Sequence, residues 1–204
     1  MAKIRPTFLI SVPKIFNKVY DTIVTRVNDA GGAKKKLFDM GVNAAKKRRA
    51  LAEQGKSSAI ANFKFNLVNK IVFQKIRDLF GGRLEGAVTG SAAMNPDISK
   101  FFFDIGIPLY DGYGLSETSP GITGNRPSCY RIGSVGQPLD KIKVVIDQSV
   151  VEPGAQDGEI VVYGPNVMKG YHNKAAATAE MMTPDGGVRT RSEEHTSELQ
   201  SRQS

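Results

Sequence analysis

LEGAVTGSAAMNPDISKFFFDIGIPLYDGYGLSETSP, residues 84–120, is the stretch that decides the fold class. Residues 84–89 and 107–110 are short apolar runs bounded by glycine or proline, and a helix-sized stretch, residues 96–104, lies between them. This order predicts a strand–helix–strand unit in an α/β fold. Such units favour parallel strands, and their ligands collect at the carboxyl ends of the strands.

A polar cluster follows each predicted strand, TGSAAM after the first and YDGYGLSETSP after the second. In the second cluster, Gly112 lets the backbone come close to a ligand, and Tyr113 offers a flat face on which a base can stack. Ser116 and Thr118 offer hydroxyl donors to phosphate oxygens, and Glu117 is a carboxylate of the kind that holds Mg²⁺ beside substrate phosphates. The cluster suits a nucleotide, although a glycine- and serine-rich run is more often a simple turn.

Spacing excludes several other chemistries. A dinucleotide-binding fingerprint needs a third glycine where Glu117 stands. The run GLSET has threonine where the nucleophile elbow of a serine hydrolase needs glycine. The sequence has one cysteine, Cys129, and His172 is the one histidine before the unusual C-terminal run, so no zinc site is expected.

The composition is that of an ordinary globular protein, with 204 residues, of which 40% are hydrophobic and 24% charged. No apolar run approaches the ~20 residues that span a bilayer, and the apolar part of the N-terminal MAKIRPTFLISVPK is too short for a signal peptide. A single cysteine fits a reducing compartment. These features predict a cytoplasmic protein.

The formal net charge of +8 is concentrated in KKK at residues 34–36 and KKRR at residues 46–49. Because apolar residues recur at helical spacing around these runs, we expect the basic side chains to form the solvated face of a helix over residues 33–53. The alternative is a basic, non-catalytic protein that binds a membrane or nucleic acid, with salt-sensitive binding that charge reversal at residues 46–49 abolishes. No aromatic residues interleave with the lysines, so no nucleic-acid partner is expected.

The flanking segments extend the α/β pattern. Residues 7–12 predict a short buried strand, and the apolar stripes at 15–27 and 60–80 predict helices before the central unit. After it, residues 142–146 and 159–163 predict strands of a more antiparallel, β-rich region. The turn-forming run VEPGAQDG joins these two strands.

The C-terminal run RSEEHTSELQSRQS, residues 191–204, has neither an apolar face nor a strand pattern. It resembles the in-frame translation of a sequencing adapter. We therefore interpret residues 191–204 as a disordered tail of artefactual origin and exclude them from the fold, as one excludes an expression scar. Residues 1–190 are then the expected folded part.

The motifs together resemble those of the adenylate-forming enzymes, the superfamily of acyl-CoA synthetases, luciferases and peptide-synthetase adenylation domains. YGLSETSP is similar to the tyrosine–glycine–x–threonine–glutamate signature, and TGSAAM, residues 89–94, to the adenosine-binding turn. GSVGQPL at 133–139 and GEIVVYGPNVMKGYHN at 158–173 resemble the next two motifs. RPTFLISVPKIFNKVYDTI and NRPSCYRIGSVGQPL look most like long-chain fatty acid–CoA ligases.

This resemblance implies that residues 1–190 are part of the large N-terminal, AMP-binding domain and that six residues bind ATP. Three would line the adenine pocket: Gly90, Asp111 and Gly112. Tyr113 would stack on the base, and Ser116 would contact the α-phosphate in place of the usual threonine. Glu117 would hold Mg²⁺.

The implied activity is activation of a long-chain fatty acid with ATP to an acyl-adenylate, followed by transfer of the acyl group to coenzyme A. ATP, Mg²⁺ and CoA are the implied cofactor and co-substrates. A lipid substrate is also compatible with peripheral contact at the inner membrane surface. The alternative within the superfamily is a ligase for another carboxylic acid.

The resemblance also leads us to expect a fragment. Residues 1–204 contain no Ser/Thr/Gly-rich phosphate loop ending in lysine, and no hinge or C-terminal domain with its catalytic lysine. PDGGVRT at 184–190 would continue in the superfamily as glycine–aspartate, where residues 191–204 stand instead. We therefore expect an internal piece of a ligase that is inactive by itself.

Overall fold

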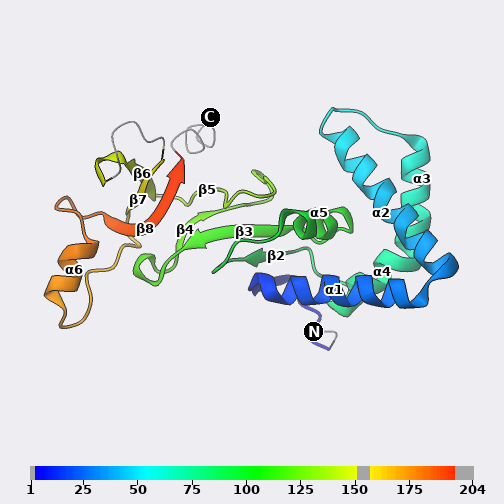
Figure 1. Cartoon of the computed structure of the whole chain (residues 1–204), viewed down its shortest axis with the longest axis horizontal. Coiled ribbons are helices and arrows are strands. Elements are labelled where there is room, and N and C mark those ends of the chain that lie inside the picture. The colour runs from blue at the N-terminus through cyan, green and yellow to red at the C-terminus, as the bar shows by residue number, and fades with distance from the viewer. Residues whose placement is uncertain (1–2, 151–156, 196–204) are drawn as a thin grey trace. The chain divides into compact units, whose positions relative to one another are not determined.

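The computed structural model describes residues 3–150 and 157–195, and the chain forms two compact units, Met1–Tyr110 and Asp111–Ser204 (Figure 1). Each unit has a hydrophobic core of its own. Residues 1–190, expected as one partial domain, are thus divided between two units.

Helices dominate the first unit. They are α1 Pro13–Ala30, α2 Gly32–Ala52, α3 Ala59–Val68, α4 Gln74–Leu79 and α5 Pro96–Asp104, with a π-helical turn, Asn69–Phe73, before α4. Pro13 and Pro96 stand in first helical turns, and the Asn95 side chain accepts a hydrogen bond from the Asp97 amide at 2.8 Å. Helices α2 and α3 lie side by side (Figure 1). In the part of the chain that the structure describes, no helix is long and apolar enough to cross a membrane.

The first unit contains the predicted strand–helix–strand arrangement. Strand β2, Gly86–Thr89, precedes α5, and β3, Leu109–Gly114, begins after it. Strand β1, Phe8–Ser11, pairs with β2 in parallel. The Ala87 amide donates a hydrogen bond to the Pro108 carbonyl at 3.0 Å, beside the start of β3. The strand order is therefore β1–β2–β3, and the predicted α/β class is confirmed.

The core of the first unit is aromatic, but one strand is less buried than predicted. Phe16 and Phe102 are completely buried and pack edge-on, with ring centroids 5.5 Å apart. In β1, by contrast, Phe8 is 51% and Ile10 is 80% exposed. Alternate residues of a strand share a face, so this face of β1 is largely exposed, although Phe8 stacks with Tyr110 at 6.4 Å between ring centroids. The predicted strand is confirmed, and its predicted burial is wrong.

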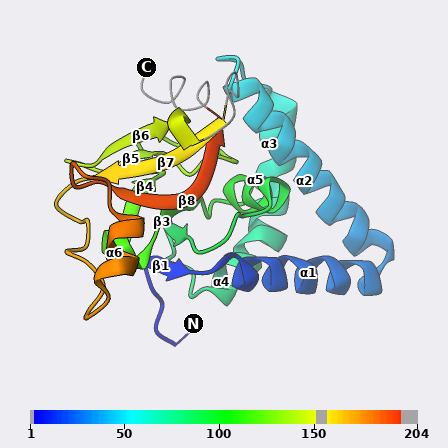
Figure 2. The ribbon, with the colours of Figure 1, turned by 60° about the vertical axis from the view of Figure 1, so that its left-hand side comes forward.

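The second unit is rich in β-structure, as predicted. Strand β3 pairs antiparallel with β4, Gly121–Gly124, and β4 pairs antiparallel with β5, Gln137–Pro138. A second antiparallel sheet, seen in Figure 2, has the order β6–β7–β8, with bounds Lys143–Asp147, Asp157–Tyr163 and Val188–His195. The unit also contains helix α6, Ala175–Met181, and 3-10 turns at Ser116–Thr118 and Gln148–Val150.

The C-terminal run differs from its prediction at the boundary. Strand β8 continues through His195, so residues 191–195, expected in the disordered tail, belong to a strand, and residues 193–195 pair with β7. Backbone pairing needs no particular side chains, which is why the composition of the run did not indicate it. Residues 196–204 lie outside the described residues, as does most of the predicted turn, at 151–156. The artefactual origin of the run stays a prediction.

Candidate functional site

Three residues of the candidate site lie in a strand. Asp111, Gly112 and Tyr113 belong to β3. The polar run, predicted to follow the strand, is instead part of it, because pairing with β4 extends β3, with Tyr113 opposite Thr123. The site therefore begins on regular backbone. Tyr113 is half-buried and packs against the core of the second unit, so its ring is held in place and still partly exposed.

A buried asparagine that is not among the predicted site residues, Asn125, fixes this strand. The Asn125 amide donates a hydrogen bond to the Asp111 carbonyl at 3.0 Å, and its side-chain Nδ2 donates to the Ser134 carbonyl. Its Oδ1 accepts from the Arg131 amide at 3.0 Å. Asn125 thus connects β3 to the GSVGQPL motif. The available signal was its position as the first residue of the quoted run NRPSCYRIGSVGQPL.

The loop after β3 is a tight turn held by its own polar groups. Thr118 is completely buried, and its hydroxyl donates to the Pro120 carbonyl at 2.8 Å and accepts from the Leu115 amide at 3.1 Å. A Cβ added to Gly114 would collide with the Pro120 carbonyl, so the turn needs glycine at that position. The Thr118 hydroxyl therefore stabilises the loop and is not the phosphate donor that its residue type suggested, while Ser116 is exposed.

A distant segment clamps the same turn. The Tyr171 hydroxyl donates a hydrogen bond to Glu117 Oε1 at 2.6 Å, across 54 residues of sequence. The Met168 amide donates to the Glu117 carbonyl at 2.8 Å, and Asn166 Nδ2 donates to the Thr118 carbonyl at 2.9 Å. The two motifs that were quoted as separate signatures are therefore in contact within the second unit.

The clamp also favours the ionised form of Glu117. The Tyr171 hydroxyl, followed by a hydrogen bond from the backbone of Glu117 itself, holds the pKa of the Glu117 carboxyl below its usual value. The same contact raises the pKa of the Tyr171 phenol. Glu117 is therefore ionised and Tyr171 protonated at neutral pH.

The donor set fits a cation that is shared with phosphates. Among residues 3–150 and 157–195 there is no group of three or more His, Cys, Asp or Glu side chains that could hold a metal. Glu117 is half-buried, and Tyr171 engages its Oε1, which leaves acceptor capacity on the carboxylate. Mg²⁺ is commonly bound by one or two carboxylates together with substrate phosphates. Glu117 suits that arrangement.

Gly90, the remaining predicted site residue, belongs to the first unit. It follows β2 directly and is half-buried, and the chain bends after it at Ser91, which has a φ of 69°. The TGSAAM cluster is thus a turn at the end of a strand, as predicted. The other five site residues, Asp111 to Tyr113 with Ser116 and Glu117, lie in the second unit.

Comparison with known families identifies the chain. The family model described as AMP-binding enzyme matches residues 1–172. The chain belongs to the AMP-binding enzyme family. This AMP-binding chain is 32% identical over 190 residues to a long-chain-fatty-acid–CoA ligase of Mycobacterium bovis, covering 93% of the chain and 30% of that protein. It is 31% identical over 191 residues to long-chain-fatty-acid–CoA ligase 1 of Cavia porcellus, covering 92% and 26%. The chain thus spans about 30% or less of the length of these curated relatives.

Solved structures support the fold of the AMP-binding chain. The adenylation and carrier didomain of a carboxylic acid reductase from Segniliparus rugosus, in complex with AMP, matches with a TM-score of 0.58 and 22% identity, over 93% of this chain and 22% of that one. A malonyl-CoA ligase with methylmalonyl-CoA and AMP bound matches with a TM-score of 0.54 and 22% identity, over 92% and 30%. These matches show that the chain shares the fold of part of each protein, and the predicted α/β fold class is confirmed.

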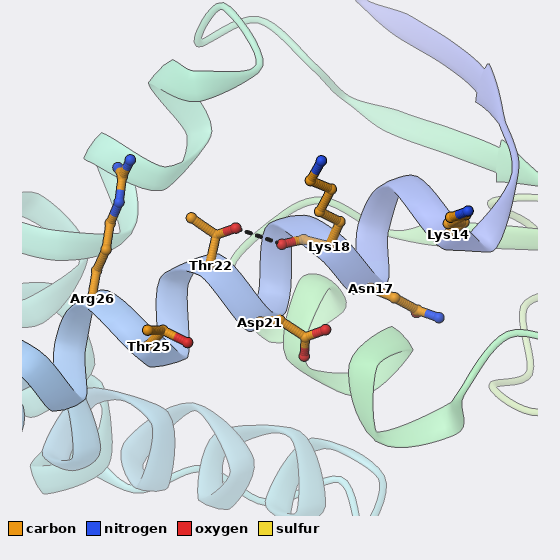
Figure 3. Close-up of a pocket in the computed structure, with 7 residues that line it drawn as sticks. All are labelled: Lys14, Asn17, Lys18, Asp21, Thr22, Thr25 and Arg26. Atoms are coloured by element: carbon orange, nitrogen blue, oxygen red, sulfur yellow. Dashed lines mark hydrogen bonds between the residues drawn. The ribbon is translucent and has the colours of Figure 1, made fainter.

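A hollow in the first unit of the AMP-binding chain is not part of this site. All seven residues that line it come from one helix, α1, as Figure 3 shows. The interaction drawn there is a local one, from the Thr22 hydroxyl to the Lys18 carbonyl at 2.7 Å. A single helix face with lysine, threonine and aspartate side chains is typical of a solvated surface. We assign the hollow no binding role.

Proposed function

We propose that this chain supplies part of the ATP site of a ligase that activates a long-chain fatty acid to an acyl-adenylate and transfers the acyl group to coenzyme A. The observation that carries the proposal is the turn Ser116–Thr118, which presents an exposed hydroxyl and an ionised carboxylate directly after the strand of Tyr113. The names of the curated relatives support the fatty-acid substrate. A ligase for another carboxylic acid is the alternative, because the supporting residues concern adenosine and phosphate.

Each site residue has a proposed role in this reaction. Gly90, Asp111 and Gly112 contact the adenine, and Tyr113 stacks on it. Ser116 donates a hydrogen bond to an α-phosphate oxygen. Glu117 holds Mg²⁺, which neutralises phosphate charge when bound.

The reaction needs no histidine base. The fatty carboxylate is already an anionic nucleophile, and its oxygen attacks the α-phosphorus of ATP while the bond to the bridging oxygen breaks and pyrophosphate leaves. The CoA thiolate then attacks the acyl carbonyl, and AMP leaves. Positioning and charge neutralisation are therefore the main tasks of the protein, and hydroxyl and carboxylate side chains suffice for them.

Replacing Tyr113 by leucine is expected to weaken AMP binding about tenfold. Stacking of a base on an aromatic ring is worth roughly 1–3 kcal/mol, and leucine keeps the apolar contact with the core while it removes the flat face. Isothermal titration of the chain with AMP measures the change. Tyr113→Phe is the matched control and should bind as the wild type does, because it keeps the ring.

The same titrations separate the proposed roles. Glu117→Gln should weaken binding of ATP with Mg²⁺ and leave binding of AMP alone unchanged.

A pyrophosphate assay with ATP, Mg²⁺, palmitate and CoA should give no signal for the 204-residue chain, because no phosphate loop occurs among its residues. Equal AMP affinity in Tyr113→Leu and Tyr113→Phe would contradict the proposed adenine site.

The structure argues against the basic run at residues 46–49 as a free phosphate-binding patch. Arg48 Nε donates to Asn62 Oδ1 at 2.8 Å, and its guanidinium lies 4.0 Å from the centroid of the Phe65 ring. Arg49 forms an ion pair with Asp104 at 2.8 Å. Two of the four cations are thus engaged within the first unit, and charge reversal there would disturb the fold.

A different surface favours peripheral membrane contact as a second proposal. On α3, Ile60 and Phe63 are 71% and 72% exposed, and Lys56 and Lys64 lie near them in sequence with exposed side chains. Exposed apolar side chains with flanking lysines suit the surface of an anionic membrane. We therefore propose that the protein works in the cytoplasm in contact with the inner membrane surface.

Replacing Ile60 and Phe63 by serine is expected to lower binding to phosphatidylserine-containing vesicles roughly tenfold or more, because burial of each large apolar side chain contributes about 1.5–3 kcal/mol. Cosedimentation with vesicles measures the partition. Leu79→Ser, at another exposed apolar position of the first unit, is the control and should change little. Unchanged binding of the double variant would refute this surface.

A further inference from the structure

The surrounding structure holds both partners of the hydrogen bond between Tyr171 and Glu117 in place. On the tyrosine side, the Tyr171 amide donates a hydrogen bond to Thr178 Oγ1 at 2.9 Å, and the Thr178 hydroxyl donates to the Lys174 carbonyl at 2.9 Å. Thr178 is part of helix α6, so the helix fixes the backbone from which the phenol extends.

Gly170 makes this arrangement possible. It has a φ of 138°, a conformation that L side chains rarely adopt. A Cβ at this position would lie 2.8 Å from Thr178 Cγ2 and 3.1 Å from Thr178 Oγ1. Glycine therefore lets Thr178 reach the amide of Tyr171. The glycine–tyrosine pair near the end of the motif at 158–173 thus has a local physical reason.

On the glutamate side, backbone and side chain are held by the same segment. The Met168 amide donates a hydrogen bond to the Glu117 carbonyl at 2.8 Å. Three residues later in the chain, the Tyr171 phenol donates a hydrogen bond to the Glu117 carboxylate at 2.6 Å. A free glutamate side chain has three rotatable bonds, and fixing it opposes cation binding entropically. A carboxylate already held in one orientation has less of that freedom to lose.

We infer that Tyr171 is a positioning residue for Glu117: its phenol, set by Gly170 and by Thr178 of α6, holds the carboxylate in the orientation in which it binds the cation of the nucleotide complex. This inference rests on the proposed function, because it takes Glu117 to be the residue that holds the cation. Hydrogen-bond partners of metal-binding carboxylates act in this way, and their loss lowers metal affinity about 10- to 100-fold.

Tyr171→Phe tests the inference by two readouts that do not depend on turnover. The first is the affinity of the chain for Mn²⁺ in the presence of ATP, measured from the electron paramagnetic resonance signal of free Mn²⁺. We expect roughly tenfold weaker binding, or about 1.4 kcal/mol. The second is the NMR order parameter of the Glu117 side chain without metal, which should fall when the phenol oxygen is removed.

Tyr163→Phe is the matched control. The Tyr163 hydroxyl also donates to a carboxylate of the second unit, Asp185 Oδ1, at 3.2 Å. The control removes the same atom from the same kind of pair and should change neither readout. Thr178→Val keeps the phenol and loosens its support, so a smaller shift in the same direction is expected.

Glu117→Gln distinguishes failure of this inference from failure of the proposed function. If it weakens Mn²⁺ binding while Tyr171→Phe leaves affinity and side-chain order unchanged, the inference is overturned and the proposed cation residue stands. If the wild type binds no Mn²⁺, or Glu117→Gln binds it equally well, the proposed role of Glu117 fails, and the positioning role fails with it.

Discussion

Replacing Gly136 by alanine is expected to lower the free energy of unfolding of the second unit by roughly 3 kcal/mol or more. Gly136 has a φ of 82°, and a Cβ there would fall on the backbone of Gly124 and Asn125. An alanine in the left-handed region costs about 1–2 kcal/mol, and overpacking against backbone adds about 1–3 kcal/mol. Unlike a flexible side chain, the backbone of β4 cannot move aside without losing its pairing.

The effect should extend to the candidate site. Asn125, against which the new methyl group would press, holds the Asp111 carbonyl. Hydrogen exchange of the Asn125 and Leu139 amides, both bonded to carbonyls of the second unit, measures the loss. Gly186→Ala is the matched control, because Gly186 has a similar φ of 89° and no atom within 4 Å of the added Cβ. Equal losses in the two variants would show that the collision does not matter.

Local patterns predicted the central part of the fold well. The boundaries 96–104 were read from the sequence, and α5 spans Pro96–Asp104. Here apolar spacing and capping chemistry agree, with Asn95 and Pro96 at the start of the helix. The antiparallel strands near 142–146 and 159–163 were equally visible, because alternation and flanking turn residues mark such strands directly.

The parts that failed depend on partners elsewhere in the chain. Strand β3 extends into the polar run because β4 pairs with it, which its own residues do not reveal. The burial of β1 was wrong because a strand's apolar character does not say whether another layer covers it.

The candidate site shows the same division. Gly112, Tyr113 and Glu117 could be identified as site residues from the sequence, because all three lie within a few residues of one another in one motif. Asn125 and Tyr171 act through hydrogen bonds across 14 and 54 residues. Such partners have no regular spacing in the sequence. A single sequence therefore does not indicate them, except where they belong to a recognised motif.

Replacing Arg49 by methionine is expected to lower the free energy of unfolding of the first unit by about 3 kcal/mol. Arg49 Nε lies 2.8 Å from Asp104 Oδ1, and the side chains are 18% and 4% exposed, so the pair joins α2 to α5 in a largely buried position. Removing one member of a buried pair leaves an uncompensated charge, which costs about 3–5 kcal/mol, and the partial exposure of Arg49 places the expectation at the lower end.

Urea denaturation compares this variant with Lys35→Met, which breaks the exposed pair between Lys35 and Asp39 on the same helix. An exposed pair contributes about 0.5 kcal/mol or less, so the control should unfold nearly as the wild type does. Arg49→Met combined with Asp104→Leu should recover most of the loss, because no buried charge remains. A double variant as unstable as Arg49→Met would show that the arginine acts by packing rather than by charge.

The pH dependence of the loss provides the sharpest check on its cause. Burial raises the pKa of Asp104, while the hydrogen bond and charge of Arg49 oppose that rise. Because the folded-state pKa is raised, the contribution of Asp104 to stability is fully present below its unfolded-state pKa and is lost as pH rises through the folded-state pKa.

Without Arg49, the folded-state pKa of Asp104 should rise further. Once Asp104 is protonated it needs no cation, so the difference between Arg49→Met and the wild type should be largest near neutral pH and shrink in acid. A difference that stays constant as the pH falls would contradict the electrostatic origin of the loss.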